Sequence, residues 1–269
     1  MKTLLKDIIR PVYHYIKNEN LREFYRLYDK WGGYNRYKRV DNVKFLNYTV
    51  DVPDLPSFIW QFKEIFVDEI YKFNARNKTP IIYDCGANIG MSCLYFKKVY
   101  PNAKIKAFEA DPVIADILKT NLSKNGIHDV EVINKAVWID YDGIEFGSEG
   151  ADGGSIYING NKIKVESIRL KDLLERETNV DLLKIDIEGA EYAVLKDCMN
   201  SLYMVKYIFV EYHSWNKEVQ KLGEILNILE KNGFRYYIEN LSKRNYPFIN
   251  YAKEQNMDLQ LNIFGVKND

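Results

Sequence analysis

The stretch YDCGANIGMSCLYF, residues 83–96, decides the fold of this chain. An apolar run that predicts a buried strand leads into a short loop with Asp84, Gly86, Asn88 and Gly90, and a helical pattern follows at once. In open α/β sheets, ligands bind at such turns, outside the carboxyl ends of the strands. The stretch therefore predicts a ligand-binding loop, and its residues must indicate which ligand it holds.

Strands and helices alternate on both sides of this loop from residue 80 onward. This alternation indicates an α/β fold with a mostly parallel sheet, and two final strands without a helix between them predict an antiparallel edge. The expected strands are residues 80–86, 103–110, 130–138, 180–189, 205–213, 234–240 and 259–266, and the expected helices are 112–126, 190–202 and 218–233.

The residues before this domain form a different kind of segment. Helical spacing of apolar residues over 21–31 and 57–73, with a strand pair near 43–53, predicts an N-terminal helical, basic extension over residues 1–76, followed by the α/β domain over 77–269. Residues 1–50 hold eleven lysines and arginines against five acids. Such an arm could contact an anionic membrane, although a solvated helix face that packs on the domain is the simpler interpretation.

Composition limits the possible functions. Lys+Arg and Asp+Glu are both 38, so the formal net charge of zero argues against a nucleic-acid binder that acts through bulk charge. The three cysteines lie in apolar runs and are expected to be buried thiols of a reducing compartment. Charged residues interrupt the apolar residues at the N-terminus, so we expect neither a signal peptide nor a membrane span there. We expect a cytoplasmic protein, at the inner face of the membrane if the arm binds lipid.

The glycine loop fits poorly with a phosphate ligand. A phosphate-binding loop needs Gly-Lys-Ser/Thr before its helix, whereas Met91, Ser92 and Cys93 follow Gly90 here. A dinucleotide fingerprint needs G-x-G-x-x-G, whereas these glycines are four apart and Asp84 precedes them. A carboxylate at that point suits a ligand with an ammonium group, as in S-adenosylmethionine.

Glu109 supports a nucleoside ligand. It ends the second expected strand, 19 residues after Gly90. A carboxylate about 20 residues beyond a glycine loop can accept hydrogen bonds from ribose hydroxyls. An exposed polar strand end is the alternative.

Several stretches together carry a family resemblance. Residues 81–112 with the pattern D-x-G-A-N-x-G, then NLSKNG, VINKAV, and VDLLKIDIEGAEYAVLKDC followed by IFVEYH, resemble the FkbM-type S-adenosylmethionine-dependent methyltransferases over about residues 80–213. The family usually has Glu-Pro after the second strand, whereas this chain has Glu109-Ala110-Asp111-Pro112.

The resemblance implies a class I methyltransferase fold, Rossmann-like, with seven strands and an antiparallel last strand. It also implies S-adenosylmethionine as cofactor and O-methylation, often of sugar hydroxyls. The implied cofactor-binding residues are Asp84, Gly86, Asn88, Gly90, Glu109, Ala136 and Asp186.

The acceptor of the methyl group is expected over the ends of the fourth and fifth strands, which are rich in acids. His213 has the ordinary pKa of a general base near neutral pH, and Glu188 and Asp186 are the other candidate catalytic residues. A salt bridge between Asp186 and Lys184 and a plain surface histidine at 213 are the alternatives. Asp186, Glu188, Glu211 and His213 also form a set compatible with Mg²⁺, Ca²⁺ or Mn²⁺, although no ligand spacing demands a metal.

The sequence therefore predicts an S-adenosylmethionine-dependent O-methyltransferase whose acceptor is a small molecule or glycan, modified on a sugar hydroxyl. A nicotinamide-dependent oxidoreductase and a non-catalytic cofactor-binding scaffold are the alternatives. Residues 140–162 are expected to form a substrate wall, or a surface hairpin around Asn159-Gly160. Nothing in the sequence predicts an oligomeric state.

Overall fold

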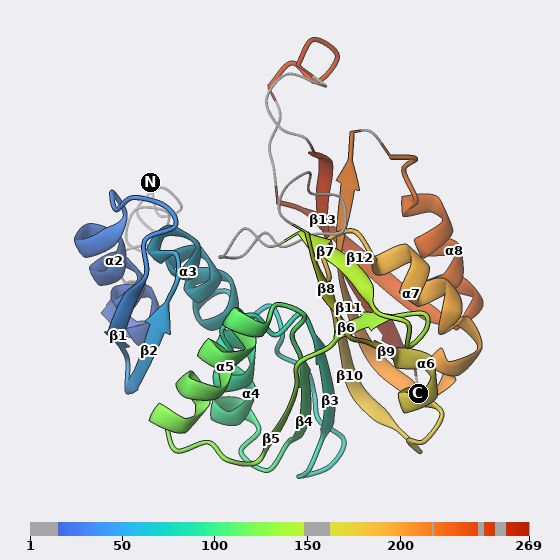
Figure 1. Ribbon diagram of the computed structural model, residues 1–269, viewed down its shortest axis with the longest axis horizontal. Helices are drawn as coiled ribbons and strands as arrows, with labels where there is room; N and C mark the ends of the chain where they lie inside the picture. The colour runs from blue at the N-terminus through green and yellow to red at the C-terminus, as the bar shows by residue number, and fades with distance from the viewer. Residues whose placement is uncertain (1–15, 148–161, 217, 242–244, 251–256, 269) are drawn as a thin grey trace, which may run out of the picture.

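The computed structural model describes residues 16–147, 162–216, 218–241, 245–250 and 257–268 (Figure 1). A seven-stranded sheet forms its centre, in the order β12-β13-β11-β10-β3-β4-β5. Every adjacent pair is parallel except those made by β13, which runs antiparallel to both β11 and β12. The strands are β3 Ile81–Cys85, β4 Lys104–Phe108, β5 Val130–Ile133, β10 Val180–Ile185, β11 Val205–Trp215, β12 Phe234–Asn240 and β13 Met257–Lys267.

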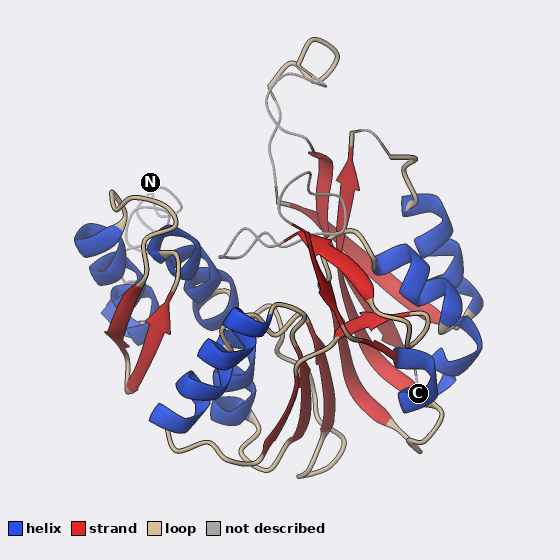
Figure 2. Cartoon of the chain, viewed as in Figure 1, coloured by secondary structure: helices blue, strands red, loops and turns tan. Residues whose placement is uncertain are grey.

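Helices cover both faces of this sheet, as Figure 2 shows. Side chains alternate along each strand, so that Ile82 belongs to one hydrophobic core and Tyr83 to the other. The first core includes α4 Met91–Val99 and α5 Pro112–Lys124, and the second includes α6 Leu170–Leu174, α7 Glu191–Asp197 and α8 Leu222–Lys231. The expected α/β architecture is therefore confirmed, including the antiparallel strand β13.

The N-terminal segment adds helices and a hairpin to the first of these cores. It consists of α2 Glu19–Trp31, β1 Val40–Phe45, β2 Tyr48–Val52, α3 Leu55–Phe62 and a π-helical turn at Lys63–Val67. Its apolar side chains, such as Leu27 and Phe62, are buried in one cluster with residues of α4 and α5. The expected boundary between residues 76 and 77 thus separates segments that share a core. The extreme N-terminus, residues 1–15, lies outside the described residues.

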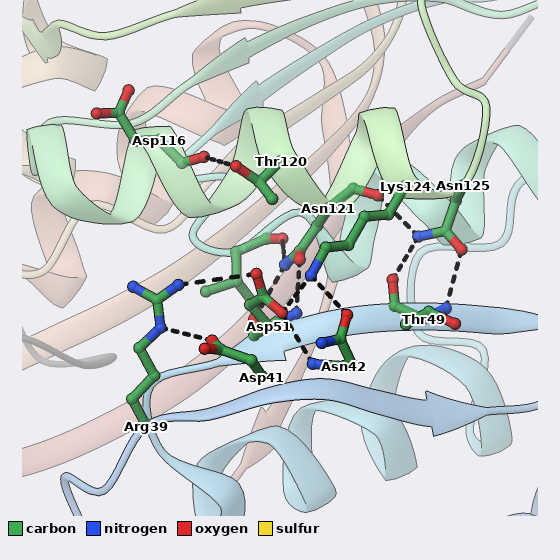
Figure 3. Close-up of polar contacts among 11 residues, drawn as sticks. Arg39, Asp41, Asn42, Thr49, Asp51, Asp116, Thr120, Asn121, Lys124 and Asn125 are labelled. Carbon is green, nitrogen blue, oxygen red and sulfur yellow. Dashed lines mark hydrogen bonds and ion pairs between the residues drawn. The ribbon is translucent and has the colours of Figure 1, made fainter.

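A polar network also joins this segment to the α/β domain (Figure 3). The buried amide of Asn121 on α5 accepts from the backbone N of Asp51 at 2.7 Å and donates to its carbonyl at 3.1 Å. The same amide donates to the carbonyl of Ile89 at 3.0 Å. Strand β2 is thereby linked, through one side chain, to the loop that follows β3.

Several expected element boundaries are wrong, and two of them have a clear physical cause. The helix expected at 57–73, with Ser57 as its N-cap, begins at Leu55 with Asp54 at the cap position, because Pro56 fits the first helical turn. The strand expected over 130–138 is split into β5 and β6 Ala136–Trp138, since Asn134 turns inward to donate to the carbonyls of Glu109 and Ala110.

The insert between the third and fourth sheet strands forms two small pairs. β6 pairs with β9 Ser167–Arg169, and β7 Ile144–Gly147 pairs antiparallel with β8 Lys162–Val165. The turn expected at Asn159-Gly160 lies outside the described residues. Within the described ranges, no helix has both the length and the apolar character needed to span a membrane.

Candidate active site

A pocket of about 560 Å³ lies at the carboxyl ends of the central strands. Its walls come from the loops after β3, β4 and β10, from the end of β11, and from the N-terminal segment. The residues used below are Arg36, Trp60, Gln61, Glu64, Gly86, Asn88, Glu109, Ala136, Asp186, Glu188, Glu211 and Gln260. This set contains five of the expected cofactor-binding residues.

The two glycines of the loop have different roles. Both have positive φ values, +84° at Gly86 and +91° at Gly90. A Cβ on Gly86 would lie 1.8 Å from the carbonyl oxygen of Asp186, so this glycine allows strand β10 to lie close to the loop. A Cβ on Gly90 would lie 2.5 Å from Leu118 on α5. Gly86 lines the pocket, whereas Gly90 serves helix packing behind it.

Asp84 lies beneath the pocket. Its carboxylate is fully buried, 3.1 Å from Nζ of Lys184, and accepts a 2.5 Å hydrogen bond from the hydroxyl of Ser92. Lys184 also lies 3.3 Å from Asp186 and donates to the carbonyl of Gly86 at 2.7 Å. A direct contact between Asp84 and a ligand ammonium group does not fit this geometry, because Ser92 and Lys184 lie in the pocket wall while Asp84 does not.

Glu109 lies where a carboxylate that binds ribose hydroxyls is expected. One carboxylate oxygen accepts from the backbone N of Asn88 and the other from the backbone N of Asp111, both at 2.9 Å. Burial raises the pKa of Glu109 to about 7, although these two N–H donors oppose the shift. The carboxylate is held at the pocket wall with fixed orientation, which suits recognition of neighbouring hydroxyl groups.

An acidic cluster borders the other side of the pocket. Asp186 follows β10 and lies beside Glu211 of β11, because the two strands are paired at Ile185 and Val210. Burial and the neighbouring Glu211 raise the pKa of Asp186 to about 6. Glu188 has a left-handed backbone, φ 54°, which is strained for a residue with a side chain and is often found at functional sites. The expected pairing of Lys184 with Asp186 is confirmed.

His213 is a poor candidate for a general base. Its side chain is 1% exposed, lies behind Glu188 and Glu211, and contacts Glu191 at 3.0 Å through Nδ1. Burial opposes its positive charge, but Glu188 and Glu191 outweigh burial and raise the pKa of His213 well above its usual value. A base must be unprotonated and must reach the substrate. The alternative of a plain surface histidine is therefore wrong, and the role of His213 as a general base stays a prediction that its burial does not favour.

The N-terminal segment was expected to contribute to acceptor specificity, but it carries no recognisable motif that would show which of its side chains line the pocket. Trp60, Gln61 and Glu64 line the pocket from α3 and its π-helical turn. Burial, followed by the charge of Glu211, raises the pKa of Glu64 to about 7. The apolar spacing of this helix indicated a buried face. The helix lies about 120 residues before the acids that follow β10, so no local pattern showed that its polar face borders the same pocket. π-Helical turns are frequent at functional sites, yet they have no reliable sequence signal.

The sheet order, the glycine loop against a carboxylate at the end of β4, and the pocket over β10 and β11 define a class I S-adenosylmethionine-dependent methyltransferase. The chain belongs to the FkbM family, because residues 84–236 match the methyltransferase FkbM domain. This assignment is inconsistent with the nicotinamide-dependent oxidoreductase that the sequence left open.

Three named relatives share sequence with the chain. The methyltransferase sdnD of Sordaria araneosa is 31% identical over 216 residues, which cover 64% of this chain and 80% of the relative. The 31-O-demethyl-FK506 methyltransferase FkbM of Streptomyces tacrolimicus is 23% identical, covering 66% and 82%. The 2-O-methyltransferase NoeI of Sinorhizobium fredii is 28% identical, covering 49% and 63%.

Solved structures with a similar arrangement include the FkbM methyltransferase of Methylobacillus flagellatus KT. It is 14% identical with a TM-score of 0.46, and the match covers 91% of this chain and 58% of that one. TYW2 of M. jannaschii, solved in complex with AdoMet, has the same identity and TM-score and covers 87% and 89%.

Proposed function

We propose that this methyltransferase transfers its methyl group to a hydroxyl of a sugar or glycoconjugate. The observation that carries the proposal is the pocket opposite the glycine loop, where the indole of Trp60 and a group of carboxylates face the same space. Sugars are typically bound by an aromatic face together with charged and amide groups that hydrogen-bond their hydroxyls.

The cofactor side of the pocket fits S-adenosylmethionine. Glu109 offers a fixed carboxylate for ribose hydroxyls, and Asn88 and Ala136 lie in the same part of the wall. Asp186 supplies a carboxylate for the ammonium group in place of the buried Asp84. When bound, the cofactor supplies an electrophilic methyl group, whose transfer to a hydroxyl oxygen leaves S-adenosylhomocysteine and releases the hydroxyl proton.

The acceptor side must hold a hydroxyl group and take up its proton. We assign Glu188 as the group that accepts this proton, because it lines the pocket just beyond β10 and has a strained backbone. Glu64 and Gln61 lie across the pocket on the N-terminal segment and are placed to bind further hydroxyls. Trp60 is 52% exposed and is supported from behind by Phe24 and Tyr28 at 5.8 and 6.3 Å between ring centroids, so its indole is held in place.

The names of two relatives are consistent with oxygen as the acceptor atom. NoeI of Sinorhizobium fredii is named a 2-O-methyltransferase. FkbM of Streptomyces tacrolimicus is named a 31-O-demethyl-FK506 methyltransferase. We also propose that the protein acts in the cytoplasm, in line with its three buried free cysteines. The basic N-terminal arm would there contact lipid at the inner face of the membrane.

The test is turnover of methyl-labelled S-adenosylmethionine with a panel of free glycans and glycolipids, followed by mass-spectrometric localisation of the methoxy group. Glu188→Gln is expected to lower kcat by about 10²–10⁴-fold, the usual contribution of a general base. His128→Ala is the control, since His128 is an exposed residue outside the pocket.

Two outcomes would contradict the proposal. Methylation of nitrogen or carbon in an active assay would reject the hydroxyl acceptor. Binding of S-adenosylhomocysteine without turnover of any panel member would favour the non-catalytic scaffold.

A further inference from the structure

Three side chains at the ends of β10 and β11 can reach a common point. Asp186, Glu211 and His213 each offer one ligand atom, and these atoms lie within 4.8 Å of one another. Glu211 and His213 are two residues apart on β11 and so share a face of the strand, next to Asp186, which directly follows β10. Asp186 and Glu211 line the pocket, so the common point is open to it.

The imidazole of His213 provides an independent indication of a ligand. Its Nε2 atom is buried and has no hydrogen-bond partner within the described part of the chain. It points toward the acids, 3.5 Å from Glu211 and 3.6 Å from Glu188, which is too far for good hydrogen bonds. A buried polar atom without a partner is costly, so this nitrogen needs one.

The other ring nitrogen is arranged as it is in metal-binding histidines. Nδ1 lies 3.0 Å from the buried carboxylate of Glu191, which also accepts from the backbone N of Gly189 at 2.8 Å. A carboxylate that accepts a hydrogen bond from Nδ1–H fixes the tautomer in which Nε2 can bind a metal. Glu211 is held in a similar way, because Gln260 donates to it at 2.6 Å.

The carboxylates around the ligand atoms of Asp186, Glu211 and His213 also favour a bound cation. Asp186, Glu188, Glu191 and Glu211 surround one imidazole, while Lys184 is shared with Asp84. The ligand atoms of Asp186 and Glu211 lie within 4.8 Å of each other and of the imidazole. Carboxylates this close repel one another, and a dication between them would relieve the repulsion.

We propose that Asp186, Glu211 and His213 bind one divalent cation of the Mn²⁺ or Mg²⁺ class. Two carboxylates suit both ions, and the imidazole favours Mn²⁺. This inference rests on the proposed function, because the cation would bind the acceptor hydroxyl and lower its pKa beside Glu188.

The experiment uses the full chain, stripped with EDTA and titrated with MnCl₂ while EPR measures free Mn²⁺. One Mn²⁺ per chain is expected, displaced by excess Mg²⁺. Coupling of Mn²⁺ to a ¹⁴N nucleus, measured by electron spin-echo modulation, is expected in the wild type and lost in His213→Ala.

Three variants sharpen the assignment. Glu211→Gln and His213→Ala are each expected to weaken Mn²⁺ binding by at least tenfold, and Glu191→Gln by about 10–100-fold, as is usual for a residue that orients a ligand. His128→Ala is the matched control and is expected to bind Mn²⁺ as the wild type does.

Calorimetric binding of S-adenosylhomocysteine to every variant reports whether the fold and cofactor site are intact. Absence of saturable Mn²⁺ binding in a wild-type protein that binds S-adenosylhomocysteine would overturn the metal site and leave the methyltransferase intact. Equal Mn²⁺ binding by His213→Ala would also overturn it. Mn²⁺ binding together with methylation at an atom other than oxygen would reject the proposed function alone.

Discussion

At the scale of single residues, two left-handed backbones shape the active site. Gly86 ends β3 and Glu188 lies just beyond β10, with φ values of 84° and 54°. Gly86 is required on two grounds, since its φ disfavours a side chain and a Cβ would overlap the carbonyl of Asp186. The position of Asp186, which follows β10, therefore depends on the absence of a side chain at residue 86.

Gly86→Ala is expected to lower the free energy of unfolding by several kcal/mol and to abolish binding of S-adenosylhomocysteine. A left-handed alanine costs about 1–2 kcal/mol, and an overpacked core typically costs about 1–3 kcal/mol more. Urea unfolding and calorimetry measure the two effects. Gly126→Ala is the matched control, because Gly126 also has positive φ but nothing within 4 Å of its Cβ position. Equal destabilisation by the two changes would show that the clash is unimportant.

The pKa of Glu109 predicts a pH dependence of cofactor binding. Burial raises it to about 7, so the group is protonated below that pH and ionised above it. An ionised carboxylate accepts hydrogen bonds at both oxygens, so affinity for S-adenosylhomocysteine is expected to rise as pH increases from 6 to 8. Calorimetry at several pH values measures this rise. Glu109→Gln is expected to bind more weakly and with a smaller rise, because only Asp186, whose pKa is about 6, would still ionise in this range. The exposed Glu131→Gln should keep the full rise. A flat wild-type profile would contradict the assignment.

At the scale of elements, α3 and its π-helical turn have two distinct faces. Ser57, Trp60, Gln61 and Glu64 line the pocket at helical spacing. Leu55, Phe58, Ile59, Phe62 and Phe66 are buried in the core. The core face fixes the position of the helix, so the polar face forms a stable wall of the pocket.

Trp60→Ala is expected to raise the KM of a glycan acceptor by about tenfold, the equivalent of roughly 1.4 kcal/mol of lost aromatic contact. Affinity for S-adenosylhomocysteine should change little, because the loop residues are untouched. Steady-state kinetics and calorimetry separate the two. Trp60→Phe should retain most of the acceptor affinity, and Tyr203→Ala serves as an exposed aromatic control at a residue outside the pocket lining. An unchanged KM in Trp60→Ala would remove this residue from the acceptor site.

Sequence patterns predicted that the loops after β3 and β4 border a pocket, but not which side chains face it from the other elements. Gly86, Asn88 and Glu109 lie in or directly after strands whose pattern is local, and their places in the pocket follow from sheet topology. The burial of Asp84 and His213 could not be predicted, because it depends on which neighbours pack over each strand end. The same holds for Trp60 and Glu64, which reach the pocket only through packing of distant segments.

At the scale of the whole molecule, the N-terminal segment is a structural part of the catalytic domain. Its apolar residues share a core with α4 and α5. Asn121 bonds to Asp51 of β2 (Figure 3) and also to Ile89 in the loop after β3. Lys124 adds a 2.5 Å ion pair to Asp51. The N-terminal wall of the pocket and the loop after β3 are therefore joined by shared packing and hydrogen bonds, and changes at their junction should affect both.

Asn121→Ala is expected to test this coupling directly. It leaves the buried N–H and carbonyl of Asp51 and the carbonyl of Ile89 without their partner, at about 1–3 kcal/mol for each unsatisfied group. The free energy of unfolding in urea should fall by several kcal/mol, and affinity for S-adenosylhomocysteine should fall with it because the loop loses its anchor. Thr120→Ala on the same helix is the control, since Thr120 is exposed and its hydroxyl bonds the carbonyl of Asp116 one turn away. If Asn121→Ala matched this control in stability and affinity, the N-terminal segment would be an independent appendage, and the pocket wall at Trp60 would have to be held by apolar packing alone.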